Sequence, residues 1–234
     1  MIRVFIGFDP KEAVAFNVLA YSIEVNASQP VSITPIMLKH LSDIHTRPRN
    51  NLSSTEFSFT RFLVPFLCNY EGWAIFMDCD MLVRGDMNKL WELRDDRYAL
   101  QVVKHDHKPS TDIKFLNQPQ TKYEKKNWSS VMLMNCAKCK ALTPEYVNEA
   151  SGLQLHQFKW LDNDDLIGEI PHEWNHLVGY DSYSKDALNV HYTEGGPYFK
   201  DYADCEYADE WWVMKDRMLF VEDAVEELVA RRRK

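Results

Sequence analysis

The chain of 234 residues is long enough for one sizeable core, and its hydrophobic (45%) and charged (26%) fractions are ordinary for a globular protein. A formal net charge of -8 argues against a nucleic-acid binder, because such proteins are usually basic. No apolar run approaches the roughly 20 residues of a membrane span, and the first residues lack a signal-peptide layout. Five unpatterned cysteines, with one lone C-x-x-C at Cys136 and Cys139, add to the expectation of a reducing cytoplasmic compartment.

Apolar runs of strand length alternate with helix-like segments along the chain. We expect strands at 2–8, 30–38, 73–77, 98–103, 130–135 and 187–192. We expect helices at 13–25, 53–67, 86–93 and 144–150. Asp9, Pro10 and Glu12 are a helix-start signature for the first of these, and Ser53 with Glu56 are one for the second. The alternation predicts an α/β fold with helices on both faces of one sheet.

Two further regions are polar. Residues 104–127 are lysine-rich and predict a long loop. The tail beyond Glu206 predicts helix and ends ARRRK, a basic end for which weak peripheral contact with an anionic membrane is the most that we expect. We therefore expect a single main domain at 1–205 and a C-terminal helical extension at 206–234.

Residues 172–181, HEWNHLVGYD, contain the zinc-protease motif H-E-x-x-H, and the glycine and aspartate that follow resemble its longer extension. A protease needs both histidines one turn apart on a helix. Pro171 directly precedes His172, so that helix would have to begin at the ligands themselves. We interpret the match as accidental. A second tract, KHDHK at 104–108, has metal-like alternating histidines, and a solvated loop is the favoured interpretation.

A competing site follows the apolar run WAIFM at 73–77, where Asp78 and Asp80 stand. Ligands of open α/β sheets bind beyond the carboxyl ends of strands, and carboxylates two positions apart on an extended chain point the same way. Two carboxylates make half of a Mg²⁺ or Mn²⁺ site that substrate phosphates commonly complete. Burial of both without a cation would be costly, so the pattern favours a metal. The alternative is that both aspartates only cap a loop.

Six segments in order along the chain resemble glycosyltransferase family 8, whose members have the GT-A fold. They are IRVFIGFD at 2–9, RFLVP at 61–65, IFMDCDMLV at 75–83, SVMLMN at 130–135, DNDDLIGEIPHEWN at 162–175 and VHYTEGGPYF at 190–199. The resemblance runs from Arg3 to about Tyr202. It implies a Rossmann-like α/β fold with a mixed, mostly parallel sheet flanked by helices.

The resemblance also implies a function and a site. It implies transfer of a hexose from a nucleotide-sugar, UDP-linked by expectation, to a hydroxyl of a glycan or glycolipid, with retention of configuration. The implied metal is Mn²⁺ or Mg²⁺, held by Asp78, Asp80 and His191. The implied donor-binding residues are Phe8, Asp9, Arg61, Asp78, Cys79, Gly195, Gly196 and Lys200. The implied catalytic residues are Asn163, Asp164 and Asp165, in a frame that could also begin at Asp162, and the implied acceptor-binding residues are Trp174 and Asn175.

Each implied role has a structural alternative. Asp9 could be a plain helix cap, Arg61 a helix-surface ion pair, and 162–165 a solvated acidic turn. The chain also departs from the family pattern. Gly196 precedes Pro197 where the family has lysine, Tyr198 replaces a tryptophan, and 128–130 read Trp-Ser-Ser where the family has Asn-Ser-Gly.

Three other functions stay open. One is a non-catalytic nucleotide-sugar-binding protein. Another is a haloacid-dehalogenase-like phosphatase, with Asp78 as nucleophile and Asp80 as acid. A zinc peptidase is the least favoured.

Overall fold

The structure is a computed structural model that describes residues 1–48, 55–106 and 124–220. Its larger sheet has six strands in the order β2-β1-β3-β6-β5-β7. These strands are β1 (Ile2–Gly7), β2 (Val31–Ile36), β3 (Trp73–Met77), β5 (Leu100–Val102), β6 (Val131–Asn135) and β7 (Ile167–Glu169). β6 runs antiparallel to both of its neighbours, and the other neighbouring pairs are parallel. The predicted mixed, mostly parallel α/β sheet is confirmed.

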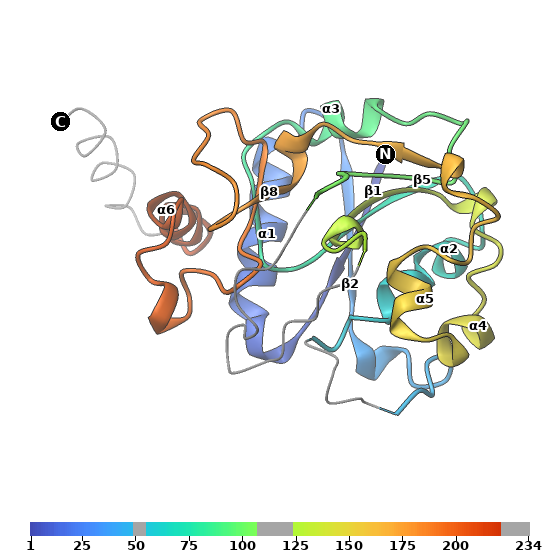
Figure 1. The fold of residues 1–234 in the computed structure, drawn as a ribbon. Helices are drawn as coiled ribbons and strands as arrows, with labels where there is room; N and C mark the ends of the chain where they lie inside the picture. Colours follow the sequence, from blue (N-terminus) through green and yellow to red (C-terminus); the bar gives the residue numbers. More distant parts are fainter. Residues whose placement is uncertain (49–54, 107–123, 221–234) are drawn as a thin grey trace.

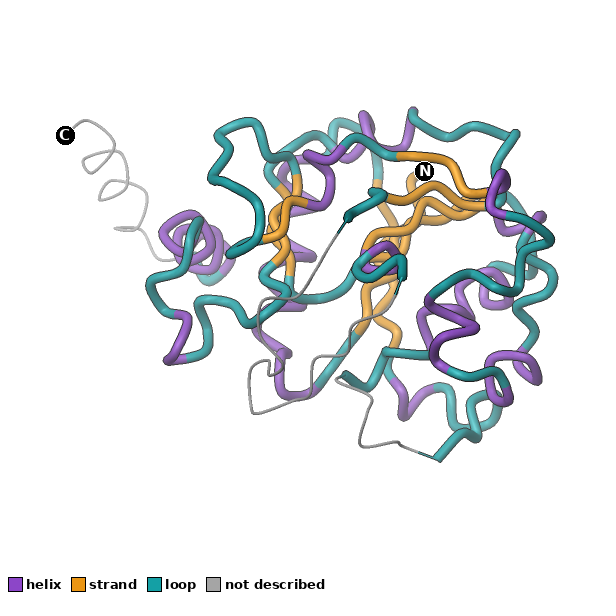
Figure 2. Tube along the Cα trace, in the orientation of Figure 1, coloured by secondary structure: helices purple, strands orange, loops and turns teal. Residues whose placement is uncertain are grey.

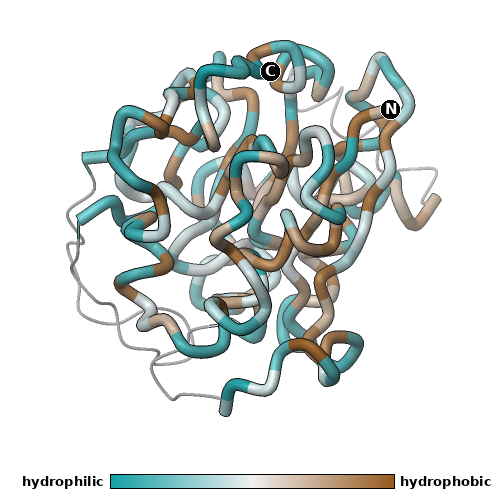
Figure 3. Tube along the Cα trace, turned by 90° about the vertical axis from the view of Figure 1, so that its right-hand side faces the viewer, coloured by the Kyte–Doolittle hydropathy of each residue, from teal (hydrophilic) through white to brown (hydrophobic). Residues whose placement is uncertain are grey.

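Helices cover both faces of this sheet (Figure 1). They are α1 (Ala13–Asn26), α2 (Val64–Leu67), α3 (Met87–Glu92), α4 (Pro144–Glu149), α5 (Gly152–His156) and α6 (Ala208–Met218). Figure 1 shows α1 on one side of the sheet and α2, α4 and α5 on the other. β3 and β6 are therefore buried on both faces, which explains why each reads as a continuous apolar run. Figure 3 shows the apolar stretches running through the interior, with hydrophilic ones at the periphery.

A second sheet of three short strands was not predicted. It consists of β4 (Met81–Val83), β9 (Asn189–His191) and β8 (His176–Leu177), in that order. Figure 2 shows its strands apart from the larger group, toward the C-terminal helix. β4 begins directly after the D-x-D segment, and its antiparallel register sets Met81 opposite His191. Strands of two or three residues are too short to leave a readable alternation, so only β9 was expected from the sequence.

The helix α6 packs beside α1 and the second sheet. Trp211 is fully buried in a cluster with Leu82, Val190 and Tyr192, so it anchors α6 to the second sheet. The rest of the predicted extension, including the basic end, lies outside the described residues. Within the described ranges, no helix is long and apolar enough to cross a membrane.

The predicted helix at 53–67 is wrong as a single element. Ser53 lies outside the described residues, and the described part forms a 3-10 turn η3 (Thr60–Leu63) followed by the one-turn α2. Pro65 has no backbone N–H to donate into an α-helix that ran through it, and it is accommodated in the first turn of α2 instead. The left-handed residues Asn69 and Tyr70 follow the end of α2.

Candidate active site

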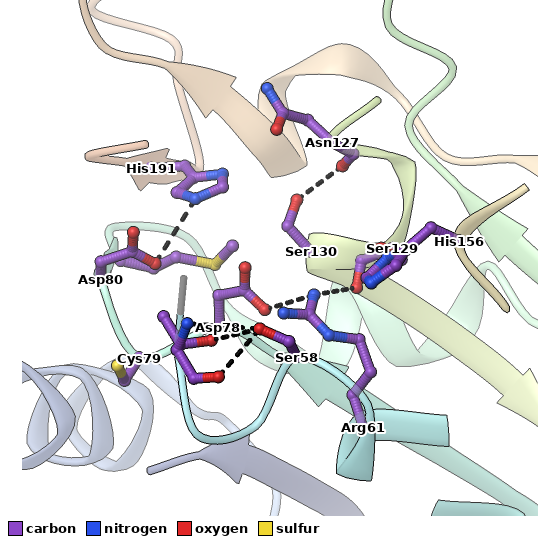
Figure 4. A network of polar contacts seen from close by, with 12 residues as sticks. Ser58, Arg61, Asp78, Cys79, Asp80, Asn127, Ser129, Ser130, His156 and His191 are labelled. Atoms are coloured by element: carbon purple, nitrogen blue, oxygen red, sulfur yellow. Dashed lines mark hydrogen bonds and ion pairs between the residues drawn. The ribbon is translucent and has the colours of Figure 1, made fainter. Parts of the chain in front are cut away.

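The three predicted metal ligands come together at the junction of the two sheets. Asp78 follows β3, Asp80 precedes β4, and His191 ends β9. One ligand atom from each lies within 4.8 Å of the others. The Nε2 of His191 is 3.4 Å from Oδ1 of Asp80, and Figure 4 shows the two side chains facing each other. The β4–β9 pairing thus joins residues that lie 111 positions apart in the sequence.

Asn175 fixes the orientation of His191. Its Oδ1 lies 3.0 Å from His191 Nδ1, while its Nδ2 donates to Ser130 Oγ (2.9 Å) and to the carbonyl of Asn127 (3.3 Å). Because the amide nitrogen is committed to two acceptors, the amide oxygen must accept from Nδ1–H of His191. The other ring nitrogen, Nε2, faces Asp80 and is an acceptor when the ring carries a single proton on Nδ1. Two acceptors at this distance require a proton or a metal ion between them, and two carboxylates with an imidazole suit Mn²⁺.

Arg61 supports Asp78 from the opposite side (Figure 4). Its Nη1 lies 2.7 Å from Asp78 Oδ1 and donates to the carbonyl of Ser129 at 2.9 Å. Arg61 is buried, so the helix-surface ion pair is not its role. Ser129 Oγ bonds Nδ1 of His156 at 2.7 Å. Burial, and secondarily Arg61, lower the pKa of His156 to about 3, so this imidazole is neutral beside the arginine.

A buried carboxyl lies behind the aspartates. Glu12 accepts a hydrogen bond from the hydroxyl of Tyr198 (2.7 Å), and Cys79 Sγ lies 4.0 Å from its other oxygen. Burial, and secondarily the charge of Asp80, raise the pKa of Glu12 to about 8. The Cys79 side chain is fully buried against this group, which restricts any donor contact of this residue to its backbone. The sequence indicated Glu12 only as part of a helix start.

The end of β1 carries Phe8 and Asp9. The carboxylate of Asp9 accepts from the backbone amides of Lys11 (2.9 Å) and Glu56 (3.1 Å). Its helix-cap role is therefore confirmed, and it also holds the 55–58 turn to the start of η1 (Pro10–Glu12). Phe8 is partly exposed and packs edge-on against Phe16 at 5.4 Å. The donor roles of Phe8 and Asp9 stay predictions.

The structure gives a separate reason for a glycine at position 195 and at position 196. Gly195 has φ +147°, which disfavours other residues. A Cβ on Gly196 would lie 2.3 Å from the Tyr198 ring, so this glycine makes room for the tyrosine that binds Glu12. Lys200 is exposed at the start of η9 (Lys200–Tyr202). Whether it replaces the family lysine stays a prediction.

The predicted catalytic residues lie on η7 (Asp164–Leu166), just before β7. The Asn163 side chain caps this turn by accepting the Asp165 amide at 2.9 Å. Asp164 forms an ion pair with Lys125 (2.6 Å), and this partner lowers its pKa. Asp164 and Asp165 are both exposed, so the turn is solvated, as the structural alternative has it. A catalytic role for these residues stays a prediction.

The H-E-x-x-H segment does not form the helix of a zinc protease. His172–Asn175 is a 3-10 turn, η8, capped by Pro171, and His176 already belongs to β8. Trp174 is 2% exposed and packs in the core, so its predicted contact with an acceptor sugar would require the ring to be uncovered. Asn175 contacts His191, and its predicted role in binding the acceptor stays a prediction.

A cavity of about 480 Å³ lies between α1, β4, the 185–188 loop and α6. Its lining includes Arg84, which pairs with Glu210 at 2.8 Å. None of the predicted site residues lines this cavity. This cavity and the cluster of metal ligands are therefore different places.

The profile of glycosyl transferase family 8 matches residues 8–141. Protein CDI of Arabidopsis thaliana is 47% identical over 218 residues, which cover 89% of this chain and 84% of that protein. The chain belongs to glycosyl transferase family 8. Family membership leaves the phosphatase and peptidase interpretations without support.

Solved structures agree on the fold. The galactosyltransferase LgtC, crystallised with donor and acceptor sugar analogues, matches with a TM-score of 0.59 at 11% identity, over 92% of this chain and 96% of LgtC. GlyE of Streptococcus pneumoniae TIGR4 matches with a TM-score of 0.60 at 16% identity, over 92% of this chain and 61% of GlyE. The chain thus spans less than two thirds of GlyE. At these identities the likeness shows the GT-A fold alone.

Proposed function

We propose that the chain is a metal-dependent glycosyltransferase that moves a hexose from a UDP-sugar to a hydroxyl of a glycan or glycolipid, with retention. The observation that carries this proposal is the convergence of Asp78, Asp80 and His191, with the His191 Nε2 turned toward a carboxylate 3.4 Å away. Family membership supports the reaction class. The galactosyltransferase named among the structural neighbours supports a hexose.

Asp78, Asp80 and His191 would hold Mn²⁺ or Mg²⁺, which would neutralise the charge that develops on the nucleoside diphosphate as the glycosidic bond breaks. Two further residues hold the metal ligands in position. Arg61 holds Asp78 through a buried ion pair, and Asn175 holds His191 through Nδ1. Both contacts fix ligand orientation before the donor arrives, which is the condition for electrostatic stabilisation of a leaving group.

The remaining roles follow the family pattern. Phe8 and Asp9 would contact the nucleoside, and the backbone at Gly195 and Gly196 would approach the phosphates. Asn163, Asp164 and Asp165 would lie beneath the reacting sugar. As part of this proposal, the protein would act in the cytoplasm, with at most weak contact to the inner face of the membrane.

Thermal unfolding against a panel of nucleotide-sugars tests the donor site. A ligand at 100 times its Kd adds about 2.7 kcal/mol to the free energy of unfolding, because it binds only the folded state. For a chain of this size that is a rise of roughly 5–10 °C in the midpoint. We expect one UDP-sugar to give this rise with Mn²⁺ and not with chelator, and the Asp80→Ala variant to lose it. The exposed Asp43→Ala variant is the matched control and should keep it.

A non-catalytic nucleotide-sugar-binding protein is the second candidate. It is favoured by Gly196-Pro197-Tyr198, where the family lysine and tryptophan are replaced and the tyrosine hydroxyl is committed to Glu12. Release of UDP by the stabilising donor distinguishes the two. Slow UDP release that needs Mn²⁺ and Asp80 supports the enzyme, whereas stabilisation without any turnover supports the binding protein. No shift with any nucleotide-sugar would contradict both.

A further inference from the structure

A second group of metal-ligating side chains includes the H-E-x-x-H segment, which the donor site leaves unused except for Asn175. His105 follows β5, His172 opens η8, and Asp181 follows β8. One ligand atom from each lies within 4.8 Å of the others. The three residues come from chain segments that are 67 and 9 positions apart, so the fold assembles them.

The spacing of two of these side chains is that of zinc ligands. His172 Nε2 lies 3.2 Å from Asp181 Oδ2. Ligand atoms of a tetrahedral zinc ion are roughly 3.3 Å apart, because Zn–N and Zn–O bonds are about 2.0–2.1 Å. The His105 ring meets the His172 ring edge-on at a centroid distance of 5.0 Å, which brings the third ligand alongside.

Hydrogen bonds already hold two of the three residues in place. The backbone amide of Leu177 donates to Asp181 Oδ2 at 2.7 Å, and the Asp181 amide donates back to the Leu177 carbonyl at 2.9 Å. The carbonyl of His105 accepts from Nε1 of Trp128 at 2.8 Å. Supporting contacts of this kind orient ligands around a metal and raise its affinity.

We propose that His105, His172 and Asp181 bind a Zn²⁺ ion whose fourth position is filled by water. Two imidazoles and one carboxylate suit zinc better than magnesium or calcium, which prefer oxygen ligands alone. His176 is not among the ligands. Its Nδ1 is 4.0 Å from Asp181 Oδ2, and its Nε2 faces the Tyr207 hydroxyl at 3.2 Å. The site therefore uses only the first histidine of H-E-x-x-H and is not that of a protease.

The position of this site gives zinc a structural effect. The ion would join the segment after β5 to the first residue of η8. The last residue of η8 is Asn175, which holds His191 of the donor site. Zinc would thus anchor the turn that orients a ligand of the first metal, while binding through a separate set of residues.

The test uses chelator-treated full-length protein carrying Asp80→Asn, so that zinc at the donor site is weakened. Equilibrium dialysis against Zn²⁺ should give one ion per chain, and X-ray absorption at the zinc edge should show two imidazoles. Adding His172→Ala or Asp181→Asn should weaken zinc binding by at least about 100-fold, more than the loss of an outer-shell partner gives. Adding His40→Ala, at an exposed histidine, should change nothing.

Two results would overturn the proposal. One is an Asp80→Asn protein that binds no zinc in dialysis. The other is zinc whose affinity and absorption spectrum do not respond to His172→Ala, which would place the ion elsewhere. His172 is half exposed, so its replacement should not unfold the chain, and circular dichroism in chelator checks this. Asp181→Asn keeps an oxygen that can accept the hydrogen bond from the Leu177 amide. If this variant unfolds nonetheless, zinc binding by His172→Ala alone tests the proposal.

Discussion

The two groups of metal-ligating side chains differ in burial and in the elements that carry them. Asp78, Asp80 and His191 stand at strand ends, with side chains 14%, 13% and 3% exposed. In the second group, the His172 side chain is 49% exposed and that of Asp181 is 24% exposed, and none of the three residues lies in a strand. Buried like-charged carboxylates need a cation, because water cannot solvate them. Arg61 supplies one cation beside Asp78, so the first group still requires compensation for Asp80. More exposed groups can be solvated without a cation, so the second group only permits one.

The first prediction, which has the largest expected effect, tests whether the first group binds a metal ion. Asp80→Ala removes the carboxylate that faces His191 Nε2 and so weakens the proposed metal site, whose cation would neutralise the leaving diphosphate. We expect transfer or donor hydrolysis to fall on the order of 1000-fold, the scale of losing one electrostatic stabiliser of a transition state. Steady-state UDP release measures it, with Asp43→Ala as the exposed control. Activity within a factor of a few of wild type would mean that the cluster is not the donor site.

A smaller effect is expected when a supporting residue is changed instead of a ligand. Asn175→Leu leaves His191 without the acceptor for Nδ1–H. We expect the Mn²⁺ concentration for half-maximal activity to rise about 10–100-fold, with most of kcat recovered at saturating Mn²⁺. Recovery at high metal distinguishes a positioning residue from one that binds the acceptor, for which the acceptor KM would rise instead. Asn17→Ala, on the exposed face of α1, should leave the metal dependence unchanged.

The first group was readable from the sequence because its signals are local. An apolar run followed by two alternate aspartates predicts a strand end with carboxylates, and the strands at 2–8, 73–77 and 130–135 are long enough to be recognised as apolar runs. The place of His191 came from the family pattern alone. Physically it depends on the three-residue β4–β9 pairing, which leaves no periodic trace.

Other parts of the site could not be predicted because they depend on tertiary contacts. Glu12 reads as a helix-start residue, and only the fold brings Tyr198 to it across 186 positions. Asn175 reads as part of a family motif, and its contact with His191 needs η8 to lie against β9. The single helix predicted at 53–67 rested on the start signature of Ser53 and Glu56, although Pro65 in the same segment interrupts an α-helix.

The burial of Glu12 beside the first group also predicts that stability depends on pH. In the metal-free protein its pKa is raised from 4.5 to about 8, so the folded state holds a proton that the unfolded state releases. Stability is then greatest below pH 4.5 on this account and falls as pH rises toward 8. The slope is at most about 1.4 kcal/mol per pH unit. Glu12→Gln cannot ionise and can still accept the Tyr198 hydrogen bond.

Urea unfolding in chelator at pH 6, 7 and 8 measures this difference. We expect the variant to lose less stability than wild type over that range, and to be the more stable protein at pH 8. Parallel pH profiles would show that Glu12 is already ionised when folded. Exposed Glu24→Gln is the control, and its profile should follow wild type.

The smallest expected effect has the opposite pH direction and concerns His156. Its pKa is lowered to about 3 when folded, against an ordinary value of 6.5, so the unfolded state binds the extra proton as pH falls. The contribution of this pKa shift to the free energy of unfolding is fully present above pH 6.5 and is lost as the pH falls toward 3. Between pH 6.5 and 5 the effect of His156 can be separated from that of most carboxylates, which titrate at lower pH. His156→Gln should flatten the loss there relative to wild type, and His40→Ala should not. If both histidine variants keep the wild-type slope, His156 is not the buried neutral partner of Ser129 and Arg61, and the ordered surroundings inferred for Asp78 lose one of their supports.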